Sequence, residues 1–182
     1  LYLCIYFNTA KKHWQIELFY KFYTIYKNNL FIGAQKTEAK RQTADIIPEI
    51  EDVIMNLMIC DDQKSELENM GQIVSEYALT HSELSLTVKC FLNPFDMLDE
   101  MGKSGVPDIV LLDICMPGIL GTEVAREILS KREGDTDIIF LTTSPDFAVE
   151  AFALHAGDYL TKPYTKQRLT DALDRLIEKR RN

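Results

Sequence analysis

Residues 109–121 of the chain are Ile-Val-Leu-Leu-Asp-Ile-Cys-Met-Pro-Gly-Ile-Leu-Gly. Four apolar residues in succession, ending at Asp113, are typical of a parallel strand that is buried on both faces, because a strand with one exposed face would alternate apolar and polar residues. The stretch therefore predicts a buried strand that carries a carboxylate at its carboxyl end.

Similar apolar runs recur on both sides of this stretch, and amphipathic helical stretches separate them. The predicted strands are Ile54–Cys60, Leu86–Phe91, Ile109–Leu112, Ile138–Leu141 and Tyr159–Leu160. Helical stripes lie between and after them, with Leu67, Met70, Val74 and Tyr77 in one and Leu169, Ala172, Leu173, Leu176 and Ile177 in another. This alternation predicts an α/β fold, a five-stranded parallel sheet with helices on both faces and right-handed crossovers.

Local signals mark the ends of some helices. Asn93–Pro94 and Ser144–Pro145 each place a capping side chain before a proline that suits the first turn of a helix. Gly157 is predicted to end the fourth helix.

The composition narrows the functional classes. The 182 residues include 28 acidic and 20 basic side chains, a net charge of -8. A surface this acidic repels nucleic-acid backbones, so we expect no direct nucleic-acid binding by this segment. The four cysteines lack metal-ligand spacing and indicate reduced thiols in a cytoplasmic protein.

The chain divides near residue 52 into two parts of different composition. Residues 1–52 have a net charge of +1 and residues 53–182 one of -9, and we expect an N-terminal extension followed by one domain. The apolar runs of residues 1–31 are too short for a spanning helix, and membrane contact there is not expected. Two alternatives stay open for the extension. It forms a short amphipathic helix through Leu18, Phe22, Ile25 and Tyr26, or residues 1–54 are not native structure and Met55 is the natural start.

Polar residues follow the predicted strands. Asp61 and Asp62 come after the first strand, Asp113 after the third, Thr142 after the fourth and Lys162 after the fifth. Because the carboxyl ends of parallel strands share one edge of a sheet, these side chains should converge. Clustered carboxylates need a counter-charge, and oxygen-only ligands favour Mg²⁺.

Such a pocket suits phosphoryl transfer to a carboxylate. A carboxylate held beside a cation and an ammonium group is well placed to attack phosphorus, and a nearby hydroxyl could donate to a phosphoryl oxygen. The expected product is an aspartyl phosphate.

The segment 53–181 resembles the receiver domain of bacterial two-component response regulators. The resemblance is carried by five motifs in order: Asp61–Asp62, the string from Leu111 to Gly118, Gly121, Thr142 and the string Tyr159-Leu160-Thr161-Lys162-Pro163. It is most similar to regulators that carry a LytTR-type DNA-binding output domain, a domain not expected within residues 1–182. The resemblance implies a flavodoxin-like fold with strand order 2-1-3-4-5.

The resemblance also implies a role for each site residue. Asp113 would be the phosphoacceptor, and Asp61, Asp62, Asp113 and the backbone carbonyl of Cys115 would hold Mg²⁺. Thr142 and Tyr159 would be the switch pair, and Lys162 the phosphate-facing lysine. The bond before Pro163 is expected to be cis. Three residues depart from the common pattern of the family, namely Cys115, Leu120 and Thr143.

The implied function is a signalling switch. A sensor histidine kinase would phosphorylate Asp113, and the face made by the fourth helix, fifth strand and fifth helix would change and favour a homodimer. DNA would be reached only through an output domain. Such a receiver catalyses only its own phosphorylation and dephosphorylation.

Two other functions compete with this interpretation. A phosphohydrolase with an aspartyl nucleophile needs a second acid two residues after the nucleophile, where this chain has Cys115. A flavodoxin-like cofactor carrier needs a phosphate loop rich in hydroxyl and amide groups, whereas Asp61 and Asp62 would repel a phosphate without a metal.

Overall fold

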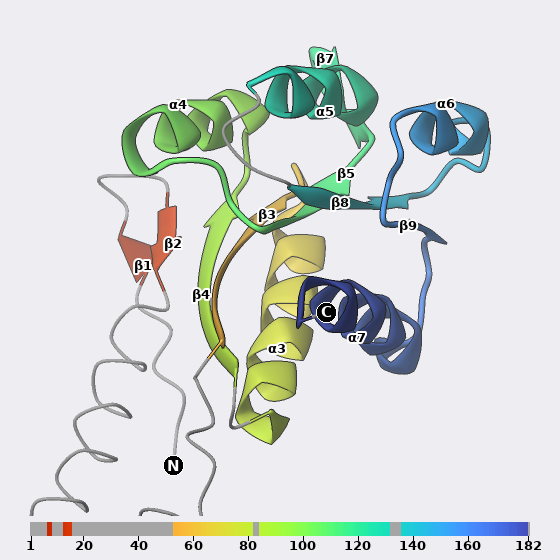
Figure 1. Cartoon of the computed structure of the whole chain (residues 1–182). Helices are drawn as coiled ribbons and strands as arrows, with labels where there is room; N and C mark the ends of the chain where they lie inside the picture. Colours follow the sequence, from red (N-terminus) through yellow and green to blue (C-terminus); the bar gives the residue numbers. More distant parts are fainter. Residues whose placement is uncertain (1–6, 9–12, 16–52, 82–83, 132–135, 182) are drawn as a thin grey trace, which may run out of the picture.

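The structure is a computed structural model, and it describes residues 7–8, 13–15, 53–81, 84–131 and 136–181. Most of the described chain forms three layers, with a twisted sheet between two layers of helices (Figure 1). The predicted amphipathic stripe of residues 18–26 lies outside the described residues. No helix among the described residues is both long and apolar enough to cross a bilayer.

Five parallel strands form most of the sheet: β3 (Val53–Cys60), β4 (Leu84–Phe91), β5 (Ile109–Asp113), β8 (Asp137–Thr142) and β9 (Asp158–Thr161). They lie in the order β4-β3-β5-β8-β9, which is 2-1-3-4-5 when the parallel strands alone are numbered. The predicted strand order is therefore confirmed, and each predicted strand agrees with the observed one to within two residues.

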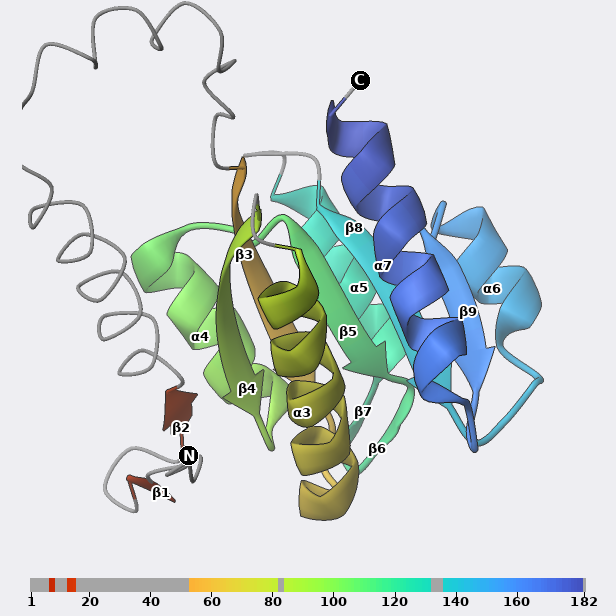
Figure 2. The same cartoon turned by 90° about the horizontal axis from the view of Figure 1, so that it is seen from below.

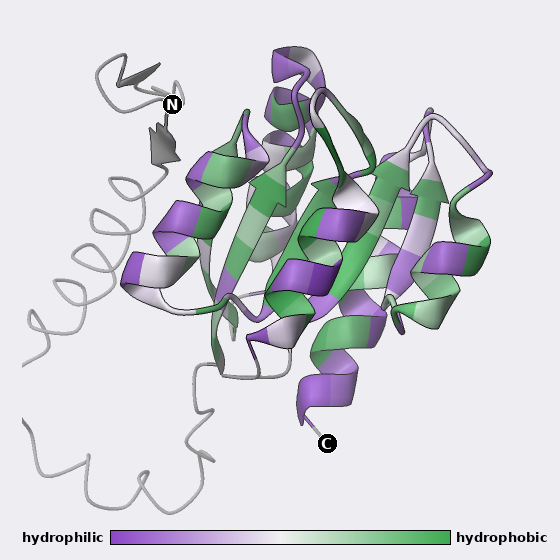
Figure 3. Cartoon of the chain, turned by 90° about the horizontal axis from the view of Figure 1, so that it is seen from above, coloured by the Kyte–Doolittle hydropathy of each residue, from purple (hydrophilic) through white to green (hydrophobic). Residues whose placement is uncertain are grey.

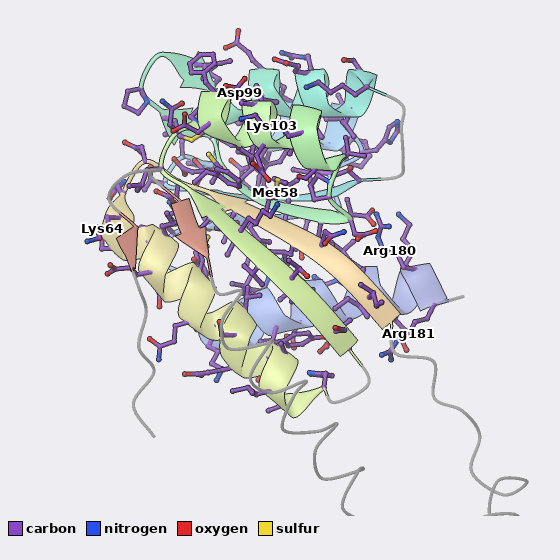
Figure 4. All side chains as sticks on the ribbon, turned by 90° about the vertical axis from the view of Figure 1, so that its left-hand side faces the viewer. Met58, Lys64, Asp99, Lys103, Arg180 and Arg181 are labelled. Atoms are coloured by element: carbon purple, nitrogen blue, oxygen red, sulfur yellow. The ribbon has the colours of Figure 1, made fainter. Side chains whose placement is uncertain are left out.

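Helices cover both faces of this sheet (Figure 2). They are α3 (Lys64–Thr80), α4 (Pro94–Ser104), α5 (Gly121–Ser130), α6 (Ala148–Ala153) and α7 (Lys166–Arg181). The residues of α3 and α7 that point at the sheet share one apolar cluster, and those of α4, α5 and α6 share the other. Met58 on β3, labelled in Figure 4, belongs to the cluster on the α4 side.

The sheet is apolar where the helices cover it (Figure 3). All five residues of β5 are buried, as its continuous apolar run predicts. Both predicted helical stripes are buried in full, on α3 and on α7. Cys60 and Cys90 are buried as well. Two-sided burial of this kind leaves only the ends of the strands free to carry polar side chains.

Short strands extend this arrangement. The pair β1 (Phe7–Asn8) and β2 (His13–Gln15) continues the sheet beyond β4, with β2 antiparallel to it. The pair β6 (Cys115–Met116) and β7 (Ile119–Leu120) forms a hairpin directly after β5. Its turn uses Gly118 at a φ of +87°, a backbone conformation that favours glycine.

The helix-end predictions have mixed outcomes. Asn93 caps α4 as predicted, since its side chain accepts a hydrogen bond from Phe95 N, with Pro94 in the first turn. The predicted cap of the fourth helix is wrong, because α6 begins only at Ala148 and Ser144 caps a preceding turn through Asp146 N. Its predicted end at Gly157 is wrong too. The helix stops at Ala153, and the left-handed residue there is His155, at a φ of +54°.

Candidate functional site

Three carboxylates meet at the carboxyl edge of the sheet. Asp61 and Asp62 follow β3, and Asp113 ends β5, the strand paired beside it. Each of the three offers one carboxylate oxygen, and these oxygens lie within 4.8 Å of one another. Asp61 is fully buried and Asp113 is 2% exposed, so water does little to screen the repulsion between them.

Lys162 brings a positive charge into the same place. It follows β9, and its Nζ donates to Asp61 Oδ2 at 2.5 Å and to Asp113 Oδ1 at 3.2 Å. The Lys162 side chain is 7% exposed, which makes this a buried ion cluster. The bond between Lys162 and Pro163 is cis, as the family resemblance implies.

The charges in the cluster shift the pKa values of its members. Burial raises the pKa of Asp113 above its usual range, the Asp61 charge adds to this, and Lys162 opposes it. Burial alone would lower the pKa of Lys162, but its hydrogen bond and charge contact with Asp61 outweigh that and raise the pKa. The cluster therefore favours the charged form of Lys162 and disfavours the charged form of Asp113.

The backbone fixes Asp61 and Asp113 in place. Asp61 N donates to Phe91 O, and Asp61 Oδ1 accepts from Gln63 N at 2.9 Å, which secures the turn into α3. After Asp113 the chain passes so close to Gly121 that a Cβ there would lie 2.1 Å from the carbonyl oxygen of Asp113. Any other residue at position 121 would displace the backbone that carries the carboxylate.

The donor set fits a magnesium ion. The three carboxylates supply oxygen ligands, and Asp62 Oδ1 is a buried oxygen without a hydrogen-bond partner among the described residues. Buried carboxylate oxygens need a cation or a donor, and a hard cation such as Mg²⁺ prefers oxygen ligands. The residues present therefore match the cation that the sequence predicts.

Thr142 lies beside this cluster, since Lys162 N donates to Thr142 O at 2.8 Å, and Tyr159 is linked to Thr142 through Ser144. Thr142 ends β8 and is fully buried, and its Oγ1 lies 3.3 Å from both Cys115 Sγ and Ser144 N. Tyr159, on β9, is half-buried against the apolar cluster of α4, α5 and α6, and its hydroxyl donates to Ser144 O at 2.5 Å. The sequence predicts Thr142 at this edge, and the family resemblance pairs Tyr159 with it, but Ser144, which bonds to both, is expected only as a helix cap.

The three positions that depart from the family pattern are all solvent-accessible. Cys115 is exposed on β6, Thr143 is exposed after β8, and Leu120 is 37% exposed just before α5. The Leu120 side chain has no acceptor for a helix cap, and instead Glu123 Oε2 accepts a hydrogen bond from Leu120 N. The β6–β7 hairpin carries Cys115 to the site, where its thiol contacts Thr142.

The fold and the site define an α/β domain with a buried acidic cluster at the carboxyl edge of a 2-1-3-4-5 sheet. Residues 57–174 match the response regulator receiver domain family. The chain therefore belongs to this family, whose members are signalling domains of two-component systems.

Individual relatives agree with this assignment. The chain is 35% identical over 127 residues to the positive alginate biosynthesis regulatory protein of Pseudomonas aeruginosa, across 65% of this chain and 46% of the relative. It is 31% identical over 123 residues to the sensory transduction protein LytT of Oceanobacillus iheyensis, across 67% and 48%. The solved response regulatory domain of protein mrkE from Klebsiella pneumoniae superposes with a TM-score of 0.59 at 28% identity, covering 68% of this chain and 96% of that domain. The chain thus spans about half the length of these curated relatives.

Proposed function

We propose that Asp113 accepts a phosphoryl group and that the domain works as a phosphorylation switch. The observation that carries this proposal is the gathering of three carboxylate oxygens within 4.8 Å, with the Lys162 ammonium bonded to two of the carboxylates. Purely structural strand ends would not collect two buried acids and a partly buried third at one edge of a sheet.

The chemistry follows from this geometry. An oxygen of Asp113 attacks the phosphorus of the donor, the bond from phosphorus to the donor atom breaks, and an acyl phosphate forms on Asp113. Lys162 lies 3.2 Å from Asp113 Oδ1, so its charge is in position to offset the negative charge that arrives with the phosphoryl group. The Thr142 hydroxyl would donate to one of the phosphoryl oxygens.

Magnesium would be held by Asp61, Asp62 and Asp113, with the backbone carbonyl of Cys115 as a fourth protein ligand. When bound, it supplies positive charge that offsets the repulsion among the acids and the incoming oxygens. Asp62 is the proposed ligand whose buried Oδ1 has no hydrogen-bond partner among the described residues. Bound Mg²⁺ would satisfy this oxygen.

The partners follow from the family. A sensor histidine kinase in the cytoplasm would donate the phosphoryl group. Thr142 and Tyr159 would transmit the added charge to the face made by α6, β9 and α7, which would then form a homodimer and control a DNA-binding output domain. The domain would catalyse only its own phosphorylation and dephosphorylation, without an external substrate.

Acetyl phosphate provides a direct test because it needs no kinase. Incubation with acetyl phosphate and Mg²⁺ should add one phosphoryl group in an intact-mass measurement, with acetate as the leaving group. The Asp113→Asn variant should gain none, and omission of the metal should diminish the signal. Phosphorylation that persists in Asp113→Asn would overturn the assignment of the acceptor.

The metal ligands need a separate measurement. Asp62→Ala should weaken Mg²⁺ binding in a calorimetric titration, whereas the exposed Asp99→Ala on α4 should leave it unchanged. Equal affinity in the wild type and in Asp62→Ala would count against Asp62 as a ligand.

A further inference from the structure

Cys115 is the cysteine nearest in sequence to the candidate phosphoacceptor, and its side chain contacts Thr142. It lies two residues after Asp113, on the strand β6, and its side chain is exposed. The thiol reaches inward to the fully buried hydroxyl of Thr142, with 3.3 Å between Sγ and Oγ1. Cys60 and Cys90 are instead buried in the apolar clusters.

The hydroxyl of Thr142 has a second partner. Ser144 N donates to the same Oγ1 at 3.3 Å. A hydroxyl group has one donor hydrogen and two acceptor lone pairs, so these two contacts occupy two of its three bonding directions. This holds whether the thiol or the hydroxyl is the donor between Cys115 and Thr142.

Ser144 links this hydroxyl to the other residue of the switch pair. Its carbonyl oxygen accepts the hydroxyl of Tyr159 at 2.5 Å, while its amide binds Thr142. The Ser144 side chain is fixed in turn, because Ser144 Oγ donates to Asp146 Oδ2 and accepts from Asp146 N. A movement of Thr142 therefore disturbs a hydrogen-bonded chain that ends at Tyr159.

We propose that the Cys115 thiol is a positioning residue that holds the Thr142 hydroxyl in its present place and so opposes its movement toward a group on Asp113. This inference rests on the proposed function. It adds to it the residue that sets the equilibrium between the present position of the Thr142 hydroxyl and a position closer to Asp113. Cys115 acts through Thr142 and does not itself react.

The size of this effect depends on two competing hydrogen bonds of the Thr142 hydroxyl, one with the Cys115 thiol and one with a phosphoryl oxygen. A thiol is a weak hydrogen-bond partner, whereas a bond from a hydroxyl to a charged phosphoryl oxygen is charge-assisted and stronger. Cys115 therefore tunes the site and does not block it. Loss of the thiol contact should change the equilibrium by about two- to fivefold, the range expected for one modest hydrogen bond.

Beryllofluoride, which binds an aspartate as a phosphoryl mimic, measures this balance without phosphoryl turnover. In the presence of Mg²⁺, Cys115→Ala should bind it about two- to fivefold more tightly than the wild type, by fluorine NMR titration. The gain should vanish when Thr142→Val is added to Cys115→Ala, and it should survive when Thr142→Ser is used instead. Thermal melting of each variant verifies that it is folded.

The outcomes separate the two proposals. Binding that is lost in Asp113→Asn but unchanged by Cys115→Ala would overturn the role of Cys115 and leave the proposed function standing. A gain that persists in the Thr142→Val background would overturn it as well, because it would reflect better access to Asp113. The absence of beryllofluoride binding to the wild type would overturn the proposed function itself.

A second measurement examines Thr142 directly. With methyl-labelled threonine, Cys115→Ala alone should move the Thr142 methyl signal part of the way toward its beryllofluoride-bound position. Cys90→Ala removes a buried thiol on β4 and should leave that signal in place. A Thr142 signal that does not move in Cys115→Ala would contradict the restraint.

Discussion

The buried carboxylate of Asp113 carries a cost in stability that the proposed function explains. It is 2% exposed and lies among two other acids, so its ionised form is less favourable in the folded chain than in water. The contact with Lys162 offsets only part of this, and the pKa of Asp113 stays above its usual range, chiefly because of burial. The carboxylate that we propose as phosphoacceptor thus lowers the stability of the fold.

Asp113→Asn should therefore stabilise the protein near neutral pH. A raised folded-state pKa means that the folded chain binds this proton more readily than the unfolded chain does. The wild type then loses stability as the pH rises from about 4, the unfolded-state pKa, through the folded-state pKa. In EDTA, the melting temperature of Asp113→Asn should exceed that of the wild type at pH 7, and the difference should shrink as the pH falls toward 4.

The exposed Asp99 on α4 provides the matched control for this comparison. Asp99→Asn should change the melting temperature little at either pH, because surface substitutions usually alter stability by no more than about 0.5 kcal/mol. A wild type that melts above Asp113→Asn at pH 7 would show that Lys162 outweighs the burial of Asp113.

At the level of elements, the start of α5 sets the position of Asp113, the phosphoacceptor that we propose. Gly121 N donates to Ile114 O, and an added Cβ would meet the Asp113 carbonyl oxygen at 2.1 Å. This atom belongs to the backbone and cannot rotate away, so the strand end or the helix would have to shift.

Gly121→Ala should consequently lower the free energy of unfolding by about 1–3 kcal/mol, the usual cost of overpacking, and should also weaken phosphorylation of Asp113. Urea denaturation and the acetyl phosphate assay measure the two effects. The control is Gly102→Ala on α4, where a Cβ would meet nothing within 4 Å and the loss of a helical glycine should stabilise by up to about 1 kcal/mol. Equal stability of the two variants would contradict the close approach at Gly121.

The sequence predicts the elements that are buried on two sides and misjudges those that are not. The run Ile109–Leu112 could be recognised because both faces of β5 are covered, which leaves a continuous apolar signal. Helix α6 has six residues and buries only Ala151 of them, so it has no stripe, and proline and glycine signals misplaced both of its ends. The β6–β7 hairpin is too short for any periodic pattern.

The parts of the site that the sequence predicts are those that the sheet topology determines. The gathering of Asp61, Asp113 and Lys162 follows from topology alone, since parallel strands deliver their ends to one edge. The contact of Cys115 with Thr142 could not be predicted, because it depends on side-chain positions in segments 27 residues apart.

Helix α7 is attached to the end of the sheet opposite the acidic cluster, mainly by one partly buried arginine. Arg180, labelled in Figure 4, donates from Nε to Asp137 Oδ2 and from its terminal nitrogen to Asp108 O, each at 2.8 Å. Lys179 also contacts Asp137, at 2.9 Å. The Arg180 side chain is 19% exposed and that of Lys179 69%, so water competes far more strongly for the lysine.

Arg180→Ala should lower the free energy of unfolding by about 1–3 kcal/mol, because it leaves a buried carboxylate and a carbonyl with fewer donors. Lys179→Ala should cost less than about 1 kcal/mol, as for other exposed ion pairs. Urea denaturation of both variants compares them under the same conditions. Equal losses of stability would show that the attachment of α7 depends on the charge of these side chains and not on the lower exposure of Arg180.

At the level of the whole molecule, a change at Asp113 must alter a surface that a partner can contact. Thr142 and Tyr159 both bond to Ser144, which lies just before α6. On that helix, Val149 is 82% and Phe152 84% exposed, and they are one helical turn apart. Large apolar side chains this exposed are candidates for an interface, and they border the face that we propose for the homodimer.

Phe152→Asp should therefore prevent dimerisation without unfolding the domain. With Mg²⁺ and beryllofluoride, the wild type should shift toward a dimer in light scattering after size exclusion, and Phe152→Asp should need a roughly tenfold higher concentration, since loss of one interface aromatic costs above 1 kcal/mol. Phe95→Asp is the matched control, because Phe95 is a phenylalanine of α4 that is 55% exposed on another part of the surface. If both variants dimerise like the wild type, the interface lies elsewhere on the domain, and the exposed pair on α6 then serves a different partner.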